Sequence, residues 1–119
     1  MNHLIAGLAA TLKPEQLDTI QLTPIGIAGL GGLGSNVACH LVRSGFSRLI
    51  LADFDRVEVS NLNRQVYFPD QLGLLKTEAL AENLLRIQPG LNPRIVANSR
   101  DLDQCVGDFR SVSGVGRMF

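Results

Sequence analysis

A glycine-rich stretch in the first third of the chain constrains its fold more than any other feature. It matches the pattern G-x-G-x-x-G and holds one further glycine; the four are Gly29, Gly31, Gly32 and Gly34. An apolar run, Ile25 to Ala28, precedes it as a buried strand would, and the spacing from Leu33 to Ser44 predicts a helix. Glycines between a strand and a helix permit a sharp turn and let phosphate oxygens approach the backbone. The stretch predicts a phosphate-binding loop, with tight strand–helix packing alone as the alternative.

Strand-like and helix-like segments alternate along the rest of the chain. Short apolar runs predict strands at Leu49–Ala52 and Arg94–Ala97, and helical spacing predicts helices at Glu15–Gln21, Lys76–Ile87 and Asp101–Phe109. Strands that alternate with helices form parallel sheets with right-handed crossovers. The sequence therefore predicts an α/β fold, a Rossmann-like parallel sheet with helices on both faces.

We expect this fold to be incomplete at the C-terminus. The chain has 119 residues, its three predicted strands do not complete a doubly wound sheet, and residues 111–119 contain no strand-length apolar run. The expected organisation is a helical segment at 1–22, a nucleotide-binding half-domain at 23–106 and an irregular tail at 107–119. A truncated chain with an out-of-frame tail would produce this pattern, and a naturally small domain with a flexible tail is the alternative.

The composition excludes several classes of function. Eleven basic residues balance eleven acidic ones, which leaves no basic footprint for nucleic acid and no polybasic membrane anchor. The longest apolar stretch is too short to span a bilayer, and the N-terminus lacks the charged region of a secretory signal. Cys39 and Cys105 form no CxxC pair, so we expect no disulfide framework, no bound structural metal and a cytoplasmic protein.

Acidic and basic side chains follow the second predicted strand. Asp53 ends that strand, where this fold places a carboxylate that binds ribose; a turn residue is the alternative. Arg64 and Lys76 come next, after a polar run from Ser60. A triphosphate carries about four negative charges, against about two on a dinucleotide pyrophosphate, and needs such cations more. These residues favour ATP over a dinucleotide, although a surface lysine and a paired loop arginine would explain each cation alone.

Four motifs together resemble the ThiF/MoeB group of adenylyltransferases, the bacterial relatives of ubiquitin-activating enzymes. They are GLGGLGSN, LADFDRVEVSNLNRQ, LLK and EALAENLLRIQP. The resemblance covers residues 1–97 and departs from the family pattern near Gly107. Within this group, the sequence of residues 1–97 is most similar to short ThiF-type proteins that act on the sulfur carrier of thiamine biosynthesis.

The resemblance implies a role for each motif residue. The glycines around Gly32 would hold the ATP phosphates, Asp53 the ribose, and Arg64 and Lys76 would be the catalytic cations. The residues lining the nucleotide would be Ser60, Asn61, Leu62, Asn63 and Arg64. The reaction would be attack by the C-terminal glycine carboxylate of a ubiquitin-like sulfur carrier, ending in Gly-Gly, on the α-phosphorus of ATP. Family members use Mg²⁺, whose Asp ligand is expected beyond the end of this chain, and pair as homodimers; we expect this chain alone to be inactive.

Three other functions remain open at this stage. The glycine loop and Asp53 also suit an NAD(P)-dependent oxidoreductase domain. A tRNA-modifying dehydratase belongs to the same superfamily, although the neutral net charge disfavours it. A remnant that binds nothing is the third.

Four further reactive or aromatic side chains are predicted to be structural. Cys39 is expected to be a small buried hydrophobe, and Cys105 has no partner nearby in the sequence for a thioester role. Tyr67 and Phe68 are expected to pack in the core rather than stack on adenine.

Overall fold

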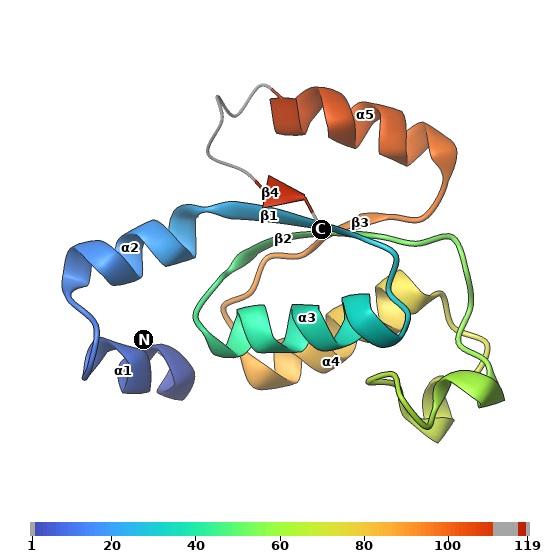
Figure 1. Cartoon of the computed structure of the whole chain (residues 1–119), viewed down its shortest axis with the longest axis horizontal. Helices are drawn as coiled ribbons and strands as arrows, with labels where there is room; N and C mark the ends of the chain where they lie inside the picture. Colours follow the sequence, from blue (N-terminus) through green and yellow to red (C-terminus); the bar gives the residue numbers. More distant parts are fainter. Residues whose placement is uncertain (1, 111–116, 119) are drawn as a thin grey trace.

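The computed structural model shows a parallel sheet with helices on both faces, as predicted (Figure 1). It describes residues 2–110 and 117–118. The strand order is β3-β2-β1-β4, with bounds β1 (Pro24–Ala28), β2 (Arg48–Ala52), β3 (Arg94–Val96) and β4 (Arg117–Met118). Every pairing is parallel, and Ile27 of β1 lies opposite Leu51 of β2.

The described residues form five α-helices: α1 (His3–Ala9), α2 (Pro14–Leu22), α3 (Gly32–Arg43), α4 (Lys76–Ile87) and α5 (Ser99–Arg110). Figure 1 shows α3 and α4 together on one face of the sheet and α5 on the other. The N-terminal pair, α1 and α2, lies beyond the end at which β1 begins. This arrangement leaves the opposite end, where the parallel strands finish, to the connecting loops.

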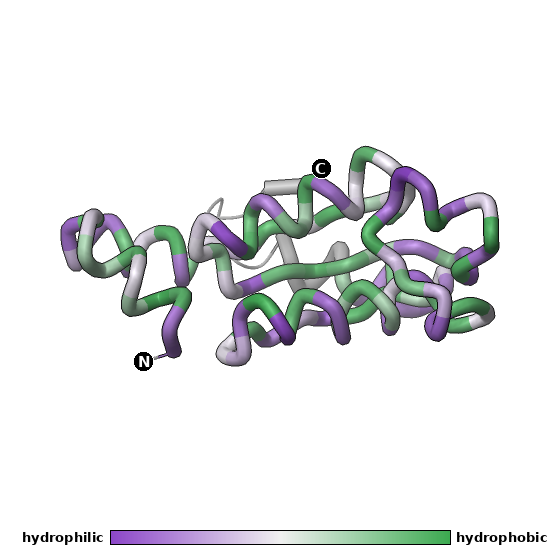
Figure 2. Tube along the Cα trace, turned by 90° about the horizontal axis from the view of Figure 1, so that it is seen from below, coloured by the Kyte–Doolittle hydropathy of each residue, from purple (hydrophilic) through white to green (hydrophobic). Residues whose placement is uncertain are grey.

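The core lies between the sheet and the α3–α4 pair. Its members share an aliphatic character and an exposed fraction near zero, as for Ile27, Leu51 and Leu80. Figure 2 shows hydrophobic colour along the strands and alternating colours along the helices. Strands covered on both faces read as continuous apolar runs, whereas helices keep a polar side towards water. This difference is why the strands and the longer helices could be located from the sequence.

The predicted elements are confirmed, and four others had not been expected. Helix α1 begins after Asn2, whose side-chain oxygen accepts from the Ile5 N–H at 3.0 Å. The polar stretch after β2 contains two short 3₁₀ helices, η1 (Val59–Asn61) and η2 (Pro69–Gln71). Short helices of this kind give too few residues for periodicity to indicate them.

The fourth unexpected element is β4, which corrects the expectation of three strands. It pairs with Ile25 and Gly26 of β1, so the edge of β1 is partly covered. A strand of two residues is shorter than any alternation that could reveal it. The predicted irregular tail began at residue 107, but residues 107–110 belong to α5, and residues 111–116 and 119 lie outside the described residues.

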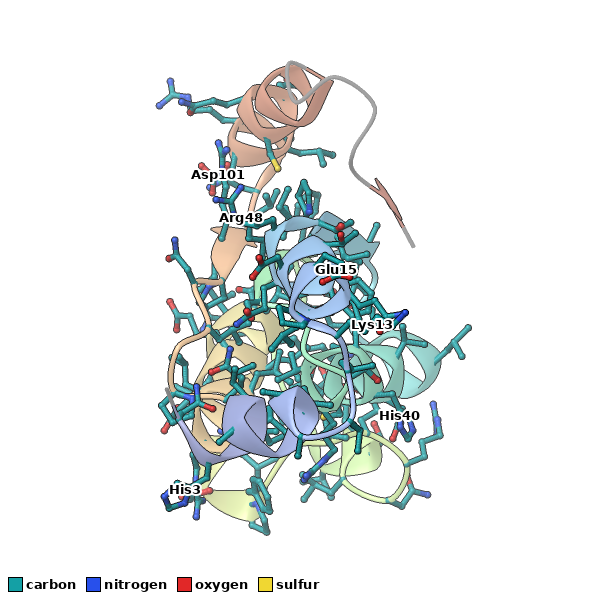
Figure 3. The ribbon with its side chains drawn as sticks, turned by 90° about the vertical axis from the view of Figure 1, so that its left-hand side faces the viewer. His3, Lys13, Glu15, His40, Arg48 and Asp101 are labelled. Atoms are coloured by element: carbon teal, nitrogen blue, oxygen red, sulfur yellow. The ribbon has the colours of Figure 1, made fainter. Side chains whose placement is uncertain are left out.

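The N-terminal helices are tied to the end of the sheet opposite the loops. Gln88, buried after α4, accepts a hydrogen bond from Asn2 and donates one to Ser47 Oγ at 2.9 Å. Figure 3 views this end, with His3 of α1 and His40 of α3 at separate places on the surface. Within the described part of the chain, no helix combines the length and the apolar character that crossing a membrane requires.

Candidate nucleotide site

The glycine stretch, Asp53 and Arg64, three parts of the predicted site, lie together at the carboxyl ends of β1 and β2. The glycine stretch, from here on called the glycine loop (residues 29–34), joins β1 to α3 at this edge, and residues 53–75 run beside it before α4 begins (Figure 1). Ligands of open parallel α/β sheets bind outside the carboxyl ends of the strands. The edge is therefore the place where the fold offers a binding site.

Two of the four glycines are required by the fold itself. Gly29 has φ +89°, a conformation that other residues rarely adopt. A Cβ on Gly34 would overlap the Gly29 carbonyl oxygen, because the loop turns back closely on α3. A Cβ on Gly31 or Gly32 would make only ordinary contacts, 3.5 Å or longer. The fold therefore does not explain Gly31 and Gly32, whereas close approach of a ligand to the backbone would.

The glycine loop presents unpaired amides at the start of α3. The first hydrogen bond of this helix runs from the Ser35 N–H to the Gly31 carbonyl at 3.0 Å. Within the described residues, none of the four backbone N–H groups of residues 31–34 has a hydrogen-bond partner. Such groups, together with the positive end of the helix dipole, attract anions. The loop therefore has the donors that a phosphate-binding loop needs.

Asp53 lies beside the loop and holds its backbone. Its Oδ2 accepts from the Leu30 N–H at 2.7 Å, and its Oδ1 accepts from the Asp55 N–H at 2.8 Å. Each carboxylate oxygen has a second lone pair, so these bonds leave acceptor capacity for ribose hydroxyls. Asp53 also lines a 330 Å³ cavity with Gly29 and Phe54, whose ring is half exposed. The position suits the binding of a ribose. The bond from the Asp55 N–H shows that Asp53 is also a turn residue, the alternative role.

Arg64 lies over the glycine loop. The nearest atoms to a Cβ built on Gly32 belong to the Arg64 side chain, with Nε at 3.5 Å. The Asn36 side-chain amide of α3 holds this segment by donating to the Arg64 carbonyl oxygen at 3.0 Å. No carboxylate among the described residues forms an ion pair with Arg64, so the alternative of a paired loop arginine is not observed. Its cation is available next to the unpaired amides.

Lys76 is buried at the start of α4, which excludes the alternative of a surface lysine. Its side chain is 7% exposed, and its backbone N–H donates to the Asp55 carbonyl at 2.9 Å. This bond holds the start of α4 at the end of β2, two residues beyond Asp53. In the described part of the structure its ammonium group has neither an ion pair nor a hydrogen bond. Nζ is not among the buried polar atoms that lack a partner, so the stem of the side chain is buried while its charged end reaches solvent and is open to an anion.

The four residues before Arg64 that were predicted to line the nucleotide differ in their exposure to solvent. Ser60 and Asn63 are exposed, whereas Leu62 packs against the core. Asn61 is buried, and its side-chain oxygen accepts from the Glu58 N–H at 2.8 Å. Asn61 and Leu62 therefore hold the segment in place; contacts of these four residues with a nucleotide stay a prediction.

A buried amide pair fixes the segment between Arg64 and Lys76. Gln71 and Asn83 exchange two hydrogen bonds, of 2.7 and 2.9 Å, and Asn83 also donates to the Val66 carbonyl at 2.8 Å. Sequence reasoning missed this pair and also Asn36, since polar residues twelve or more positions apart carry no signal of contact. Together they attach the loop that carries Arg64 to the helix that begins with Lys76.

The four side chains predicted to be structural divide into three outcomes. Tyr67 is buried, as expected, and Cys105, for which no degree of burial had been predicted, is buried too. Cys39 is only half buried, although it packs against the core, and burial raises the pKa of its thiol more than nearby Arg43 lowers it. The core prediction is wrong for Phe68, whose ring is half exposed because the chain turns outward into η2.

Metal ligands do not gather in the described residues. No three His, Cys, Asp or Glu side chains come together there. The Mg²⁺ expected with ATP is therefore not assigned to any residue of this part of the chain.

Comparison with known proteins identifies the same residues as one family domain. The ThiF family matches residues 3–115, which runs past Gly107, where the resemblance was expected to end. Ubiquitin-like modifier-activating enzyme 5 of Caenorhabditis briggsae is 38% identical over 93 residues, covering 75% of this chain and 22% of the enzyme. The chain thus spans about a fifth of that relative's length.

Two solved E. coli structures share the fold. The tRNA N6-threonylcarbamoyladenosine dehydratase TcdA, in complex with ATP, superposes with a TM-score of 0.76 at 31% identity, covering 87% of this chain and 44% of that one. MccB with ATP superposes with a TM-score of 0.68 at 33% identity, covering 74% and 28%. With the family match over most of its length, the chain belongs to the ThiF family.

Proposed function

We propose that the chain forms the ATP-binding part of an enzyme that adenylates a protein carboxylate. The substrate would be the C-terminal glycine of a ubiquitin-like sulfur carrier of the ThiS type, in thiamine biosynthesis. The observation that carries the proposal is one sheet edge that holds four unpaired amides and two cations, Arg64 and Lys76, without carboxylate partners among the described residues. This excess of donors and positive charge suits a triphosphate.

The proposal gives each part of ATP a place. The amides of residues 31–34 and the Arg64 guanidinium would bind phosphate oxygens, and Asp53 would bind the ribose beside the 330 Å³ cavity. ATP-bound TcdA and ATP-bound MccB support this reading, because both share the fold at over 30% identity. The oxidoreductase alternative has no comparable support, since it gives Lys76 no role.

The proposed step needs no protein nucleophile. The carrier's carboxylate is already ionised near neutral pH, and its oxygen attacks the α-phosphorus. A bond forms between these two atoms, the bond from the α-phosphorus to the bridging oxygen breaks, and pyrophosphate leaves with the electron pair. Lys76 and Arg64 would stabilise the charge that builds on the α-phosphate and the leaving group. Catalysis would rest on positioning and electrostatics.

Relatives favour a small protein as acceptor. Their names describe activators of ubiquitin-like modifiers, and MccB has been crystallised together with MccA. A carrier, a homodimer, bound Mg²⁺ and a cytoplasmic location complete the proposal. The second candidate is a tRNA-modifying dehydratase, favoured by the TM-score of 0.76 with TcdA.

ATP–pyrophosphate exchange tests the proposal, because labelled pyrophosphate enters ATP only if an acyl-adenylate forms reversibly. Since the chain spans 22% of the C. briggsae enzyme, exchange is measured on the chain and on a fusion that continues it with the C-terminal part of a full-length relative. We expect the fusion, and not the chain alone, to show exchange with a Gly-Gly-ended carrier and none with a carrier that lacks both glycines. Exchange that requires N6-threonylcarbamoyladenosine tRNA would instead establish the dehydratase function.

A further inference from the structure

We propose that Tyr67 is a positioning residue that fixes the glycine loop in the conformation that receives the phosphates of ATP. The inference rests on the proposed ATP site and adds a residue to which neither the family motifs nor the relatives' names point. Tyr67 lies three residues beyond Arg64, is 4% exposed, and donates its hydroxyl proton to the Leu30 carbonyl oxygen at 2.7 Å.

Leu30 of the glycine loop is fixed through its side chain, its backbone N–H and its backbone carbonyl. Its side chain is fully buried in the core, Asp53 accepts its N–H, and Tyr67 donates to its carbonyl. The two hydrogen bonds come from different segments, the end of β2 and the stretch after Arg64. Both planar groups next to Leu30, its two peptide bonds, are therefore fixed in orientation.

The residues on either side of Leu30 cannot provide this fixation. Gly29 and Gly31 have no side chains, and glycine retains the greatest backbone freedom of any residue. The peptide that Tyr67 fixes joins Leu30 to Gly31, and the unpaired amides of residues 31–34 begin at that peptide. Preorganised donors bind better than donors that must be ordered when the ligand arrives. The Tyr67 hydroxyl thus acts on the phosphates through the loop.

Tyr67 also links the loop to the cation above it. The segment of residues 64–67 is joined to the loop and α3 at two points, by Tyr67 to the Leu30 carbonyl and by Asn36 to the Arg64 carbonyl at 3.0 Å. Arg64 is itself one of these two attachment points, three residues before Tyr67, and its side chain lies over Gly32. Loss of the Tyr67 bond would therefore loosen the position of Arg64 relative to the amides.

Tyr67→Phe tests the inference, because it removes the hydroxyl and keeps the ring. The chain is titrated with ATP and, separately, with adenosine, and binding is followed through the amide signals of ¹⁵N-labelled protein. We expect ATP affinity to fall about tenfold and adenosine affinity to stay within about twofold, because adenosine has no phosphate for the loop. A merely structural role would weaken both ligands equally or neither.

The matched control is Ser47→Ala at the opposite end of the sheet. Ser47 also forms a partly buried hydroxyl hydrogen bond, with Gln88, so its loss tests whether general destabilisation changes affinity. We expect this variant to bind ATP and adenosine as the wild type does. A tenfold loss of ATP affinity in Ser47→Ala would overturn the inference.

A second measurement leaves the fold unaltered. Tyr67 is the single tyrosine of the chain, so biosynthetic labelling with 3-fluorotyrosine places one ¹⁹F nucleus at this site. We expect ATP to shift its resonance and adenosine to leave it in place; equal shifts would overturn the inference. If the wild type binds no ATP at all, the proposed function itself fails, whereas intact ATP binding by Tyr67→Phe overturns only the role of Tyr67.

Discussion

The stem of Lys76 is buried, whereas its Nζ is not among the buried polar atoms that lack a partner, so the ammonium group reaches solvent at the end of the side chain. We predict that Lys76→Met leaves the stability of the free chain within about 0.5 kcal/mol of the wild type and weakens ATP binding at least tenfold. Thermal unfolding without nucleotide and calorimetric titration with ATP measure the two effects.

The chain offers a matched control for this change. Lys13, its only other lysine, is exposed at the start of α2. Lys13→Met should leave both unfolding temperature and ATP affinity close to those of the wild type. If Lys76→Met instead destabilised the free chain and bound ATP normally, Lys76 would have a structural role that the contacts do not show.

Tyr67 gives a pH dependence whose sign follows from its environment. Burial, and then the nearby Asp53 carboxylate and Cys39, raise the pKa of its hydroxyl above the ordinary value of about 10. Above that ordinary value the unfolded chain loses this proton while the native chain keeps it, so stability falls as pH rises. We predict a loss of stability above about pH 10 that is smaller in Tyr67→Phe, measured by urea unfolding from pH 8 to 11. Parallel curves for the two proteins would contradict the assignment.

At the scale of elements, we expect one glycine of the glycine loop to be needed for stability and another to be needed for ATP binding. Gly34→Ala should destabilise the protein by about 3 kcal/mol or more, because its Cβ overlaps the Gly29 carbonyl oxygen. Gly32→Ala should leave stability within about 1 kcal/mol of the wild type, since helices favour alanine, and should weaken ATP binding by narrowing the space beside Arg64. Denaturant unfolding and ATP titration of both variants distinguish the roles; normal ATP binding by Gly32→Ala would remove the phosphate role from that glycine.

The buried amide pair provides a second comparison between elements. Asn83→Ala would remove both hydrogen bonds of the pair and the side-chain donor to the Val66 carbonyl, at a cost of about 1–3 kcal/mol, while Gln71 would keep its bonds to the Phe68 N–H and the Ala79 carbonyl. Thr77→Val is the control, because the Thr77 hydroxyl is buried and has no hydrogen-bond partner in the structure, and valine has a similar shape. We expect urea unfolding to show a destabilised Asn83→Ala and a Thr77→Val equal to or more stable than the wild type. Equal losses in the two would show that packing, and not the amide pair, holds the segment.

The sequence predicted the elements whose apolar residues form a run or recur at a regular spacing. It did not predict the elements that depend on single contacts. The strands and the helices α2 to α5 follow runs and spacings that burial imposes. Helix α1 and strand β4 are short, and β4 depends on pairing with β1, far away in the sequence. Tyr67 and Phe68 are neighbours in the chain, yet only Tyr67 is buried. The apolar character of Phe68 does not reveal that the chain turns outward at η2.

At the scale of the whole molecule, the sequence placed the site by topology. Parallel strands bring their carboxyl ends to one edge, so Asp53, the glycine loop and the start of α4 had to lie near one another. The position of Arg64 over Gly32 and the burial of Lys76 needed the structure, because a long loop with 3₁₀ turns separates them from β2. Membership of the ThiF family supports nucleotide chemistry at this site. The acceptor of the reaction has to be identified by experiment.

The most direct test of the account is the amide spectrum of the glycine loop during titration with ATP and with NADH. We predict that ATP shifts the N–H signals of residues 31–34 and that Lys76→Met reduces the ATP affinity read from those shifts. Loop signals that respond to NADH and remain unchanged with ATP would contradict the central claim that this edge of the sheet binds a triphosphate.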